Sequence, residues 1–373
     1  MIRPGLTFDD VLLEPRKTAV YRRDTIVATR LSKKARLAIP LLAAASDTVS
    51  DARFAIALGR LGGMAVLHRN CPLEEQVAMV KQVKAAGLPA GAAVGPLDVS
   101  RAVALAKAGA DFIFIDCAHA HAPGIIEAAK EMKRKINNPR SADGAPPLLR
   151  GITSLRPLGV SPSQEGERMP TQLVVGNVAT KEAAHDFVKF ADALKVGIGP
   201  GAICTTRIVS GVGVPQLTAI MDVVSVAKKR GIPVIADGGI RYSGDIVKAL
   251  AAGASTVMIG QMFAGTLEAP GEVITENGKE YKSYRGMGSK EALEKRHAVD
   301  RYSAEKTHSV VEGVSGKVPC KGPLEGVVEQ LLGGLRAGMG YIGAKTIEEM
   351  PKQARFIQIT NAGLRESHPH SLS

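Results

Sequence analysis

Short apolar runs recur along the chain, and polar, helix-like segments separate them. Nearly every position within a run is apolar, so the runs do not alternate as the strands of a one-sided antiparallel sheet would. Continuous apolar strands between helices are typical of a parallel sheet that is covered on both faces. The runs predicted as strands are residues 38–45, 63–68, 89–94, 112–116, 172–176, 193–197, 233–237 and 256–260.

Helices are predicted where apolar residues return every three or four positions, as Val247, Leu250 and Ala251 do. Eight strand-then-helix units favour an α/β fold of the closed (β/α)8 TIM-barrel type over an open doubly wound sheet. We expect one domain over residues 1–373, with its chemistry on the loops that follow the strands. The predicted helices are residues 51–61, 73–86, 100–108, 181–190, 215–230 and 243–252.

Two segments do not follow this alternation of strands and helices. Residues 137–170 are rich in Pro, Gly, Ser and charge, and are predicted to form a surface excursion. Residues 271–322 follow the last strand and are predicted to form a hairpin plus a mobile flap, because a long loop in a compact domain usually serves the site. Asn277 and Gly278 lie between two strand-like runs, which indicates a hairpin turn with two positive φ angles.

Composition excludes several classes of protein. The chain is 45% hydrophobic and 23% charged, as a folded globular protein is. No apolar run reaches the ~18 residues that span a bilayer, and the N-terminus shows no secretory signal, so we expect a cytoplasmic protein with no membrane partner. The net charge of +12 is spread along the chain, and aromatics are only 4%. These features indicate a basic surface or attraction of anionic substrates, without specific nucleic-acid binding.

One cysteine lies in an unusual loop. Cys204 follows the sixth strand among closely spaced glycines, and Lys195 and Arg207 nearby would favour its thiolate form. A nucleophile is one reading, and a small buried residue is the other. No CxxC pair occurs, so neither a zinc site nor a disulfide framework is expected. The cysteines are Cys71, Cys117, Cys204 and Cys320, and the loop glycines are Gly199, Gly201, Gly211 and Gly213.

Later loops predict a nucleotide site. Asp237 ends the seventh strand in the stretch IADGGIR, where its carboxylate suits ribose hydroxyls and the following glycine amides suit a phosphate. Gly260 and Gly265 follow the eighth strand, and late barrel loops are the usual phosphate site of this fold. The stretch YRGMG at 284–288 is placed to close over a nucleotide.

These residues resemble a known family. The stretches LTFDDVLLEP, GIGPGAICTTR, GVGVPQ, IADGGIR, YKSYRGMGS and RESHPH together resemble inosine-5′-monophosphate (IMP) dehydrogenase, whose superfamily includes guanosine-5′-monophosphate (GMP) reductase. The resemblance runs from residue 6 to residue 370. It implies a (β/α)8 barrel and NAD-dependent oxidation of IMP to xanthosine monophosphate in guanine nucleotide biosynthesis.

The resemblance also implies a two-step reaction. Cys204 would attack the purine carbon between the two ring nitrogens, a hydride would pass to NAD, and water would release the product from the thioimidate. A flap with an Arg-Tyr pair serves the second step in the dehydrogenases, and Arg301 and Tyr302 match it here. Thr206 with Glu312 resembles the family's second proton path.

Further roles are carried over from the same resemblance. The implied substrate-binding residues are Asn177, Lys195, Ala202, Asp237, Gly239, Gly260, Gln261, Tyr284, Gly286, Met287, Gly288 and Glu312. The implied NAD-binding residues are Asp116, Cys117, Ala118, Gly197 and Gly199. A potassium ion would be held by backbone oxygens of Gly199, Gly201 and Cys204, with Glu366, Ser367 and His368 of a neighbouring chain in a homotetramer.

The chain also departs from the family pattern. Most dehydrogenases insert a pair of nucleotide-sensing CBS modules after the second helix, whereas residues 86–89 connect directly here, so no CBS domain is expected. Ala44, Ser46, Ala202 and Gln261 stand where the family usually has substrate-contacting side chains, and the NAD segment reads DCAHAHA. A GMP reductase, or a catalytically silent nucleotide-binding barrel, are the alternatives. The reductases lack the Arg-Tyr pair.

Overall fold

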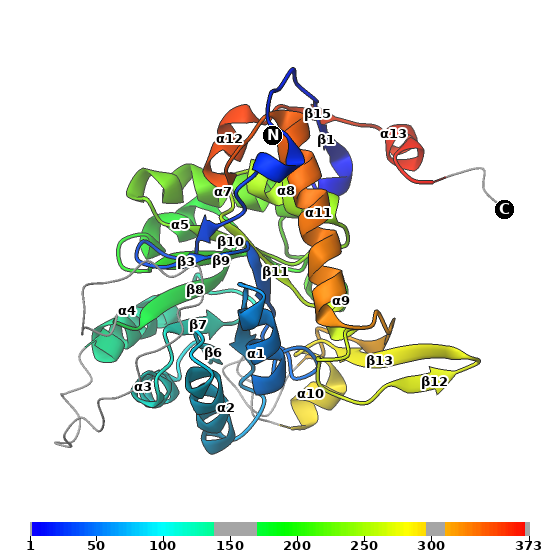
Figure 1. The fold of residues 1–373 in the computed structure, drawn as a ribbon. Coiled ribbons are helices and arrows are strands. Elements are labelled where there is room, and N and C mark those ends of the chain that lie inside the picture. The colour runs from blue at the N-terminus through cyan, green and yellow to red at the C-terminus, as the bar shows by residue number, and fades with distance from the viewer. Residues whose placement is uncertain (1, 138–169, 296–309, 370–373) are drawn as a thin grey trace.

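The fold is a closed barrel of eight parallel strands, seen in a computed structural model that describes residues 2–137, 170–295 and 310–369. Figure 1 shows the strands with helices around them. The barrel closes where β11 pairs with β4, with Val257 opposite Leu41. All eight predicted strands are confirmed. They are β4 Leu41–Ala43, β5 Met64–Leu67, β6 Gly91–Val94, β7 Phe112–Asp116, β8 Gln172–Val178, β9 Ala193–Val196, β10 Val234–Asp237 and β11 Thr256–Ile259.

The strands are mostly apolar because both of their faces are buried. Leu42, Met64, Phe114 and Ile235 pack inside the barrel, while the alternate residues pack against the surrounding helices. Leu31 lies next to the short antiparallel pair β2 Thr29–Arg30 and β3 Arg36–Leu37 and joins the inner cluster. A site is therefore expected at the carboxyl ends of the strands and on the loops that follow them.

Helices begin at capping side chains that the sequence provides. Asp51 accepts a hydrogen bond from the backbone N–H of Phe54 at 2.8 Å, and Asp98 and Thr180 cap two further helices in the same way. The helices around the barrel are α1 Ala52–Arg60, α2 Leu73–Ala85, α3 Val99–Ala108, α4 Pro123–Asn137, α5 Lys181–Phe187, α7 Gln216–Ala227, α8 Ser243–Ala251 and α11 Leu324–Ile342.

Two of these helices fall outside the predicted set. Helix α4 starts with Pro123 and Gly124 and then carries many charges, which hides its apolar face. Helix α11 contains several glycines, which lower intrinsic helix propensity, but it buries Leu331, Leu335 and Met339. Tertiary packing decides its structure.

The segment after the eighth strand contains the predicted hairpin. Strands β12 Ile274–Glu276 and β13 Lys279–Arg285 meet at Asn277 and Gly278, whose φ angles are +50° and +73°. A third strand that the pattern did not predict, β14 Ser315–Pro319, pairs with β13. Helix α10, Lys290–Glu294, lies between them in sequence.

The connections between the barrel elements bear on three further predictions: the absence of an inserted domain, the excursion and the flap. Helix α2 ends at Ala85 and β6 begins at Gly91, so within this described stretch no domain is inserted. Most of the predicted excursion at 137–170, and the flap residues 296–309, lie outside the described residues. Among the helices that the structure describes, none has the length and apolar character to cross a bilayer.

Near the termini, β1 Val11–Leu13 pairs with β15 Phe356–Gln358. Two short helices follow in the C-terminal region, α12 Met350–Gln353 and α13 Asn361–Glu366. Figure 1 shows α13 standing away from the barrel.

A core aromatic pair allows a test of this packing. Phe54 on α1 and Phe263 on the short helix α9 Gln261–Ala264 have ring centroids 5.6 Å apart, and neither side chain is exposed. We expect Phe54→Ala to lower the free energy of unfolding by about 3–5 kcal/mol, because it leaves a cavity. Urea unfolding measures the change. Ile208→Ala is the control, since Ile208 is 85% exposed, and equal losses in both variants would contradict the assignment.

Candidate active site

A cavity of about 350 Å³ opens at the carboxyl ends of the barrel strands. Barrel geometry brings these ends together, as the sequence pattern predicts. The predicted substrate and NAD residues that line the cavity are Asp116, Cys117, Ala118, Asn177, Lys195, Gly197, Gly199, Ala202, Asp237, Gly239, Gly260, Gln261, Tyr284, Gly286 and Met287. The predicted catalytic residues that line it are Cys204 and Thr206.

Cys204 heads a chain of hydrogen bonds. Its half-buried thiol donates to the hydroxyl of Thr206 over 3.2 Å, and that hydroxyl donates to Oε2 of Glu312 over 2.6 Å. The backbone joins the same segments, because the N–H of Thr205 donates to the carbonyl of Glu312. The thiol is therefore linked to a carboxylate through one hydroxyl, which is an arrangement that can move a proton.

The Cys204 loop is held by hydrogen bonds from an arginine. Arg207 donates from Nε to the carbonyl of Ile198 at 3.0 Å and from Nη2 to the carbonyl of Val214 at 2.6 Å. Its stem passes so close to Gly199, where φ is +74°, that a Cβ there would lie 2.6 Å from Cγ of Arg207. Burial lowers the pKa of Arg207, and nearby Cys204 opposes that change.

The predicted effect of two cations on the thiol stays a prediction. Arg207 lies near enough to Cys204 for their charges to interact, and two of its N–H groups also donate to loop carbonyls. Lys195 directs its ammonium group to Asp237, Asp116 and Asn177. Both side chains thus also satisfy buried hydrogen-bonding groups, which sequence proximity alone does not reveal.

Lys195 is the centre of a buried polar cluster. Its Nζ lies 2.6 Å from Oδ2 of Asp237 and 3.5 Å from Oδ1 of Asp116, and it also contacts Oδ1 of Asn177. The side chain is 2% exposed, so its charge needs these carboxylates. Asn177 donates to the same Oδ2 of Asp237 at 2.9 Å. The contacts of Lys195 and Asn177 with the Asp237 carboxylate are thus both made to Oδ2.

Another part of the cavity wall, beginning next to Asp237, is built largely from backbone. Gly238 and Gly239 have φ angles of +93° and +81°, and they follow Asp237 directly. A Cβ at Gly260 would lie 2.4 Å from the Tyr284 hydroxyl, so only glycine fits there. Such a surface of amides with little side-chain bulk suits a phosphate group.

Some predicted residues do not line the cavity. Gly288 and Glu312 stand behind it, and Glu312 reaches Cys204 through Thr206. Arg301 and Tyr302 lie outside the described residues. The proposed potassium ligands Glu366, Ser367 and His368 come at the end of α13, which contacts the short turn Phe8–Asp10. The ring of His368 is 5.9 Å from that of Tyr242.

Several residues of the cavity wall were not predicted as site residues, among them Thr7, Asp9, Arg241 and Arg285. The guanidinium of Arg241 pairs with Asp9. All four lie inside the motifs LTFDD, IADGGIR and YRGMG. Their position within these motifs could have identified them as cavity residues.

Alkylation distinguishes the cysteines. Cys71 and Cys117 are buried, and burial raises the pKa of Cys71 to about 11, whereas Cys204 and Cys320 are half-buried. We expect iodoacetamide at mildly alkaline pH to modify Cys204 and Cys320 more than ~10-fold faster than the two buried thiols, because the exposed thiolate reacts. Peptide mass spectrometry over time measures the rates. Faster labelling of Cys71 than of Cys204 would contradict the structure.

Comparison with known proteins shows the family. A sequence model of the "IMP dehydrogenase / GMP reductase domain" matches residues 5–144 and 163–370. The chain is 42% identical to an inosine-5′-monophosphate dehydrogenase of Cryptosporidium parvum, with 100% of this chain and 96% of that protein covered. It is 38% identical to one of Thermoplasma acidophilum (100% and 95%) and 40% identical to one of Mycobacterium leprae (99% and 90%).

The Thermoplasma alignment runs over 495 positions against 373 residues here, so that relative has residues with no counterpart in this chain. The family model leaves residues 145–162 unmatched. Both the family match and the identities extend over nearly the whole chain. The chain therefore belongs to the IMP dehydrogenase / GMP reductase family.

Proposed function

We propose that the protein is an IMP dehydrogenase, which oxidises IMP to xanthosine monophosphate with NAD as the hydride acceptor. The observation that carries this proposal is the position of Cys204, half-buried at the cavity and hydrogen-bonded through Thr206 to Glu312. The relatives compared above are named as dehydrogenases, in agreement with it.

Cys204 starts the reaction as nucleophile. Its proton passes toward Thr206 and Glu312 as sulfur bonds to the purine carbon between the two ring nitrogens. That carbon then carries hydrogen on a tetrahedral centre, from which hydride leaves with the electron pair of the C–H bond. A thioimidate on Cys204 remains. Covalent attachment thus divides one difficult oxidation of an aromatic carbon into easier steps.

Water completes the reaction. It attacks the thioimidate carbon, loses a proton to the enzyme, and expels the Cys204 sulfur, which recovers a proton. We assign the proton from water to Arg301, oriented by Tyr302, with Thr206 and Glu312 as a second route. An arginine has a pKa above ~12, so Arg301 needs a site that favours transient proton loss.

The cavity suits a purine nucleotide. Oδ2 of Asp237 is held by Lys195 and Asn177, so its other oxygen can accept from a ribose hydroxyl. The phosphate would lie on the backbone of Gly239 and Gly260, with the Tyr284 hydroxyl beside it. Gly286, Met287 and Gly288 would lie near the base. At positions 202 and 261, an alanine and a glutamine leave fewer hydroxyl donors for the phosphate, each worth ~0.5–1.5 kcal/mol net.

The residues assigned to NAD fit an extended ligand. Asp116 presents a carboxylate for a ribose, and Cys117, Ala118, Gly197 and Gly199 leave a wall with little side-chain bulk. When bound, NAD supplies the hydride-accepting ring.

A potassium site and a homotetramer belong to the same proposal. The backbone oxygens of Gly199, Gly201 and Cys204 lie on one loop, while Glu366, Ser367 and His368 would come from the α13 of a second chain. The proposal also includes the domain organisation. It has one domain over residues 1–373 without CBS modules, an excursion at 137–170, and a hairpin plus flap at 271–322.

Removing the nucleophile tests the covalent step. We expect Cys204→Ala to abolish NADH formation from IMP and NAD, by a factor above ~10³, because the other thiol in the cavity wall, Cys117, is buried and donates to the carbonyl of Gly176. Absorbance of NADH measures the rate. Cys320→Ala is the matched control and should retain wild-type activity. Turnover that survives Cys204→Ala would exclude the covalent mechanism.

Separating the two steps tests the role of Arg301. We expect Arg301→Ala to form NADH in a single rapid burst, of about one equivalent per site, and then to stall, because hydride transfer does not need the guanidinium. Stopped-flow absorbance measures burst and steady state. Loss of the burst itself would contradict this role. NADPH oxidation with GMP would instead favour the reductase reading.

A further inference from the structure

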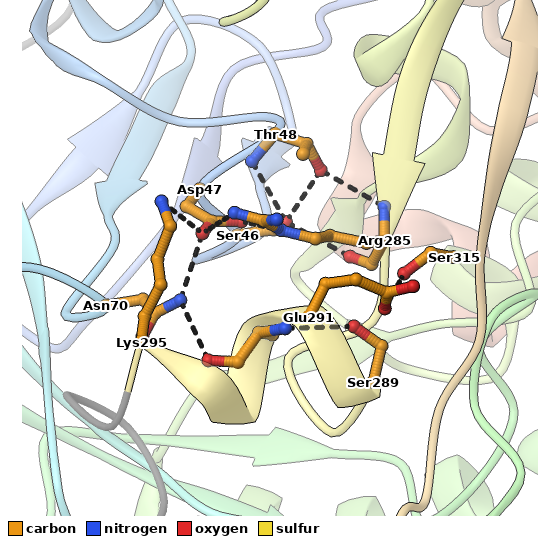
Figure 2. A network of polar contacts seen from close by, with 10 residues as sticks. Ser46, Asp47, Thr48, Asn70, Arg285, Ser289, Glu291, Lys295 and Ser315 are labelled. Carbon is orange, nitrogen blue, oxygen red and sulfur yellow. Dashed lines mark hydrogen bonds and ion pairs between the residues drawn. The ribbon is translucent and has the colours of Figure 1, made fainter.

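Three consecutive residues after β4 hold one residue at the end of β13 (Figure 2). The Ser46 hydroxyl donates to the carbonyl of Arg285 at 3.4 Å, and the Thr48 hydroxyl accepts from its N–H at 3.3 Å. Between them, the Asp47 carboxylate accepts from Nε at 3.0 Å and from Nη2 at 2.5 Å. We call this group, residues 46–48 with Arg285, the Arg285 clamp.

Asp47 is the centre of the Arg285 clamp. Its side chain is 3% exposed, and it also accepts from Asn70 at 2.9 Å and lies 3.5 Å from the ammonium of Lys295. Burial alone would raise the pKa of Asp47. The hydrogen bonds and charge of Arg285 and the hydrogen bond from Asn70 outweigh burial, so the pKa of Asp47 lies below its usual value. A buried, two-pronged pair of this kind fixes the orientation of both partners.

The clamp joins two segments of the cavity wall. Ser46 belongs to one segment, and Arg285, Gly286 and Met287 belong to the other. The two segments lie about 240 residues apart in sequence, and β4 and β13 belong to different sheets. Without the clamp, no shared sheet would fix their separation.

The clamped segment continues to the thiol relay. The N–H of Gly286 donates to the carbonyl of Val314, and the N–H of Glu312 donates to the carbonyl of Gly288, at 3.0 and 3.1 Å. Glu312 in turn accepts from Thr206, the partner of Cys204. A shift of residues 285–288 would therefore displace both the wall beside the substrate and the carboxylate of the relay.

We propose that Asp47 is a positioning residue of this enzyme: through Arg285 it holds residues 286–288 against the bound nucleotide and Glu312 in register with Cys204. This inference rests on the proposed function. Asp47 does not line the cavity, so it acts through Arg285 and not by touching substrate.

The test compares Asp47→Asn with a matched carboxylate on the other end of the barrel. Asp111 accepts from Lys84 and from the N–H of Ala90, both at 2.8 Å, and does not line the cavity. We expect Asp47→Asn to raise KM for IMP by about 10-fold and to lower kcat/KM by ~10- to 100-fold, because the wall is misplaced. Asp111→Asn should lower Tm while KM stays at the wild-type value.

Two further variants keep the inference testable if Asp47→Asn does not fold. Thr48→Val keeps the volume but removes the acceptor for the Arg285 N–H, and Arg285→Lys keeps the charge but removes the two-pronged contact. Both should raise KM for IMP by a few-fold or more. If KM for IMP in Asp47→Glu lies between the values for Asp47→Asn and the wild-type protein, that result would support the need for a carboxylate at this position.

The outcomes distinguish a failure of the inference about Asp47 from a failure of the proposed function. Wild-type turnover with unchanged KM in the clamp variants would overturn the inference about Asp47 alone. Equal changes in Asp47→Asn and Asp111→Asn would reduce Asp47 to a structural role and also overturn it. Absence of IMP oxidation by the wild-type protein would overturn the proposed function and the inference together.

Discussion

One buried ammonium group holds the floor of the cavity together. Lys195 on β9 is almost fully enclosed, and its charge is balanced by Asp116 from β7 and Asp237 from β10, with Asn177 from β8. Burying an ion without such partners costs several kcal/mol, so four neighbouring strands are tied to one point. The same contacts orient Asp237, which lines the cavity. Ligand recognition and the integrity of the barrel floor therefore depend on one cluster.

The reactive thiol is positioned by different means. Its loop has no regular structure between Gly197 and Thr206, and Arg207 braces it from below through the carbonyls of Ile198 and Val214. Thr206 opens a short helix and presents its hydroxyl between Cys204 and Glu312. The polar floor and the braced loop both border the cavity, which Lys195 and Cys204 line.

Sequence reasoning predicted the barrel well because its strands are buried on both faces, which makes each run apolar and easy to recognise. It missed α11 because glycines within that helix lower its intrinsic propensity, and packing against α8 outweighs them. It missed β14 because an edge strand with exposed, polar residues carries no such pattern. The hairpin was predictable because Asn277-Gly278 meets a local backbone requirement.

The same contrast holds for the site. Motifs identified many of the residues that line the cavity, since several of them, such as IADGGIR, end a barrel strand and continue into its loop. The pairing of Asp47 with Arg285 was not predictable, because it joins distant segments and depends on how the hairpin returns to the barrel. The buried partners of Lys195 and Arg207 were not predictable for a related reason: nearness in sequence does not show which buried group a cation must satisfy.

Direct observation of a bond to Cys204 tests the central claim best. Wild-type protein mixed with IMP and NAD and quenched in acid within one turnover would be digested and analysed by mass spectrometry. The account predicts that the peptide containing Cys204 gains the mass of IMP, less the hydride and proton that leave. An unmodified Cys204 peptide at every quench time, while NADH accumulates, would contradict it.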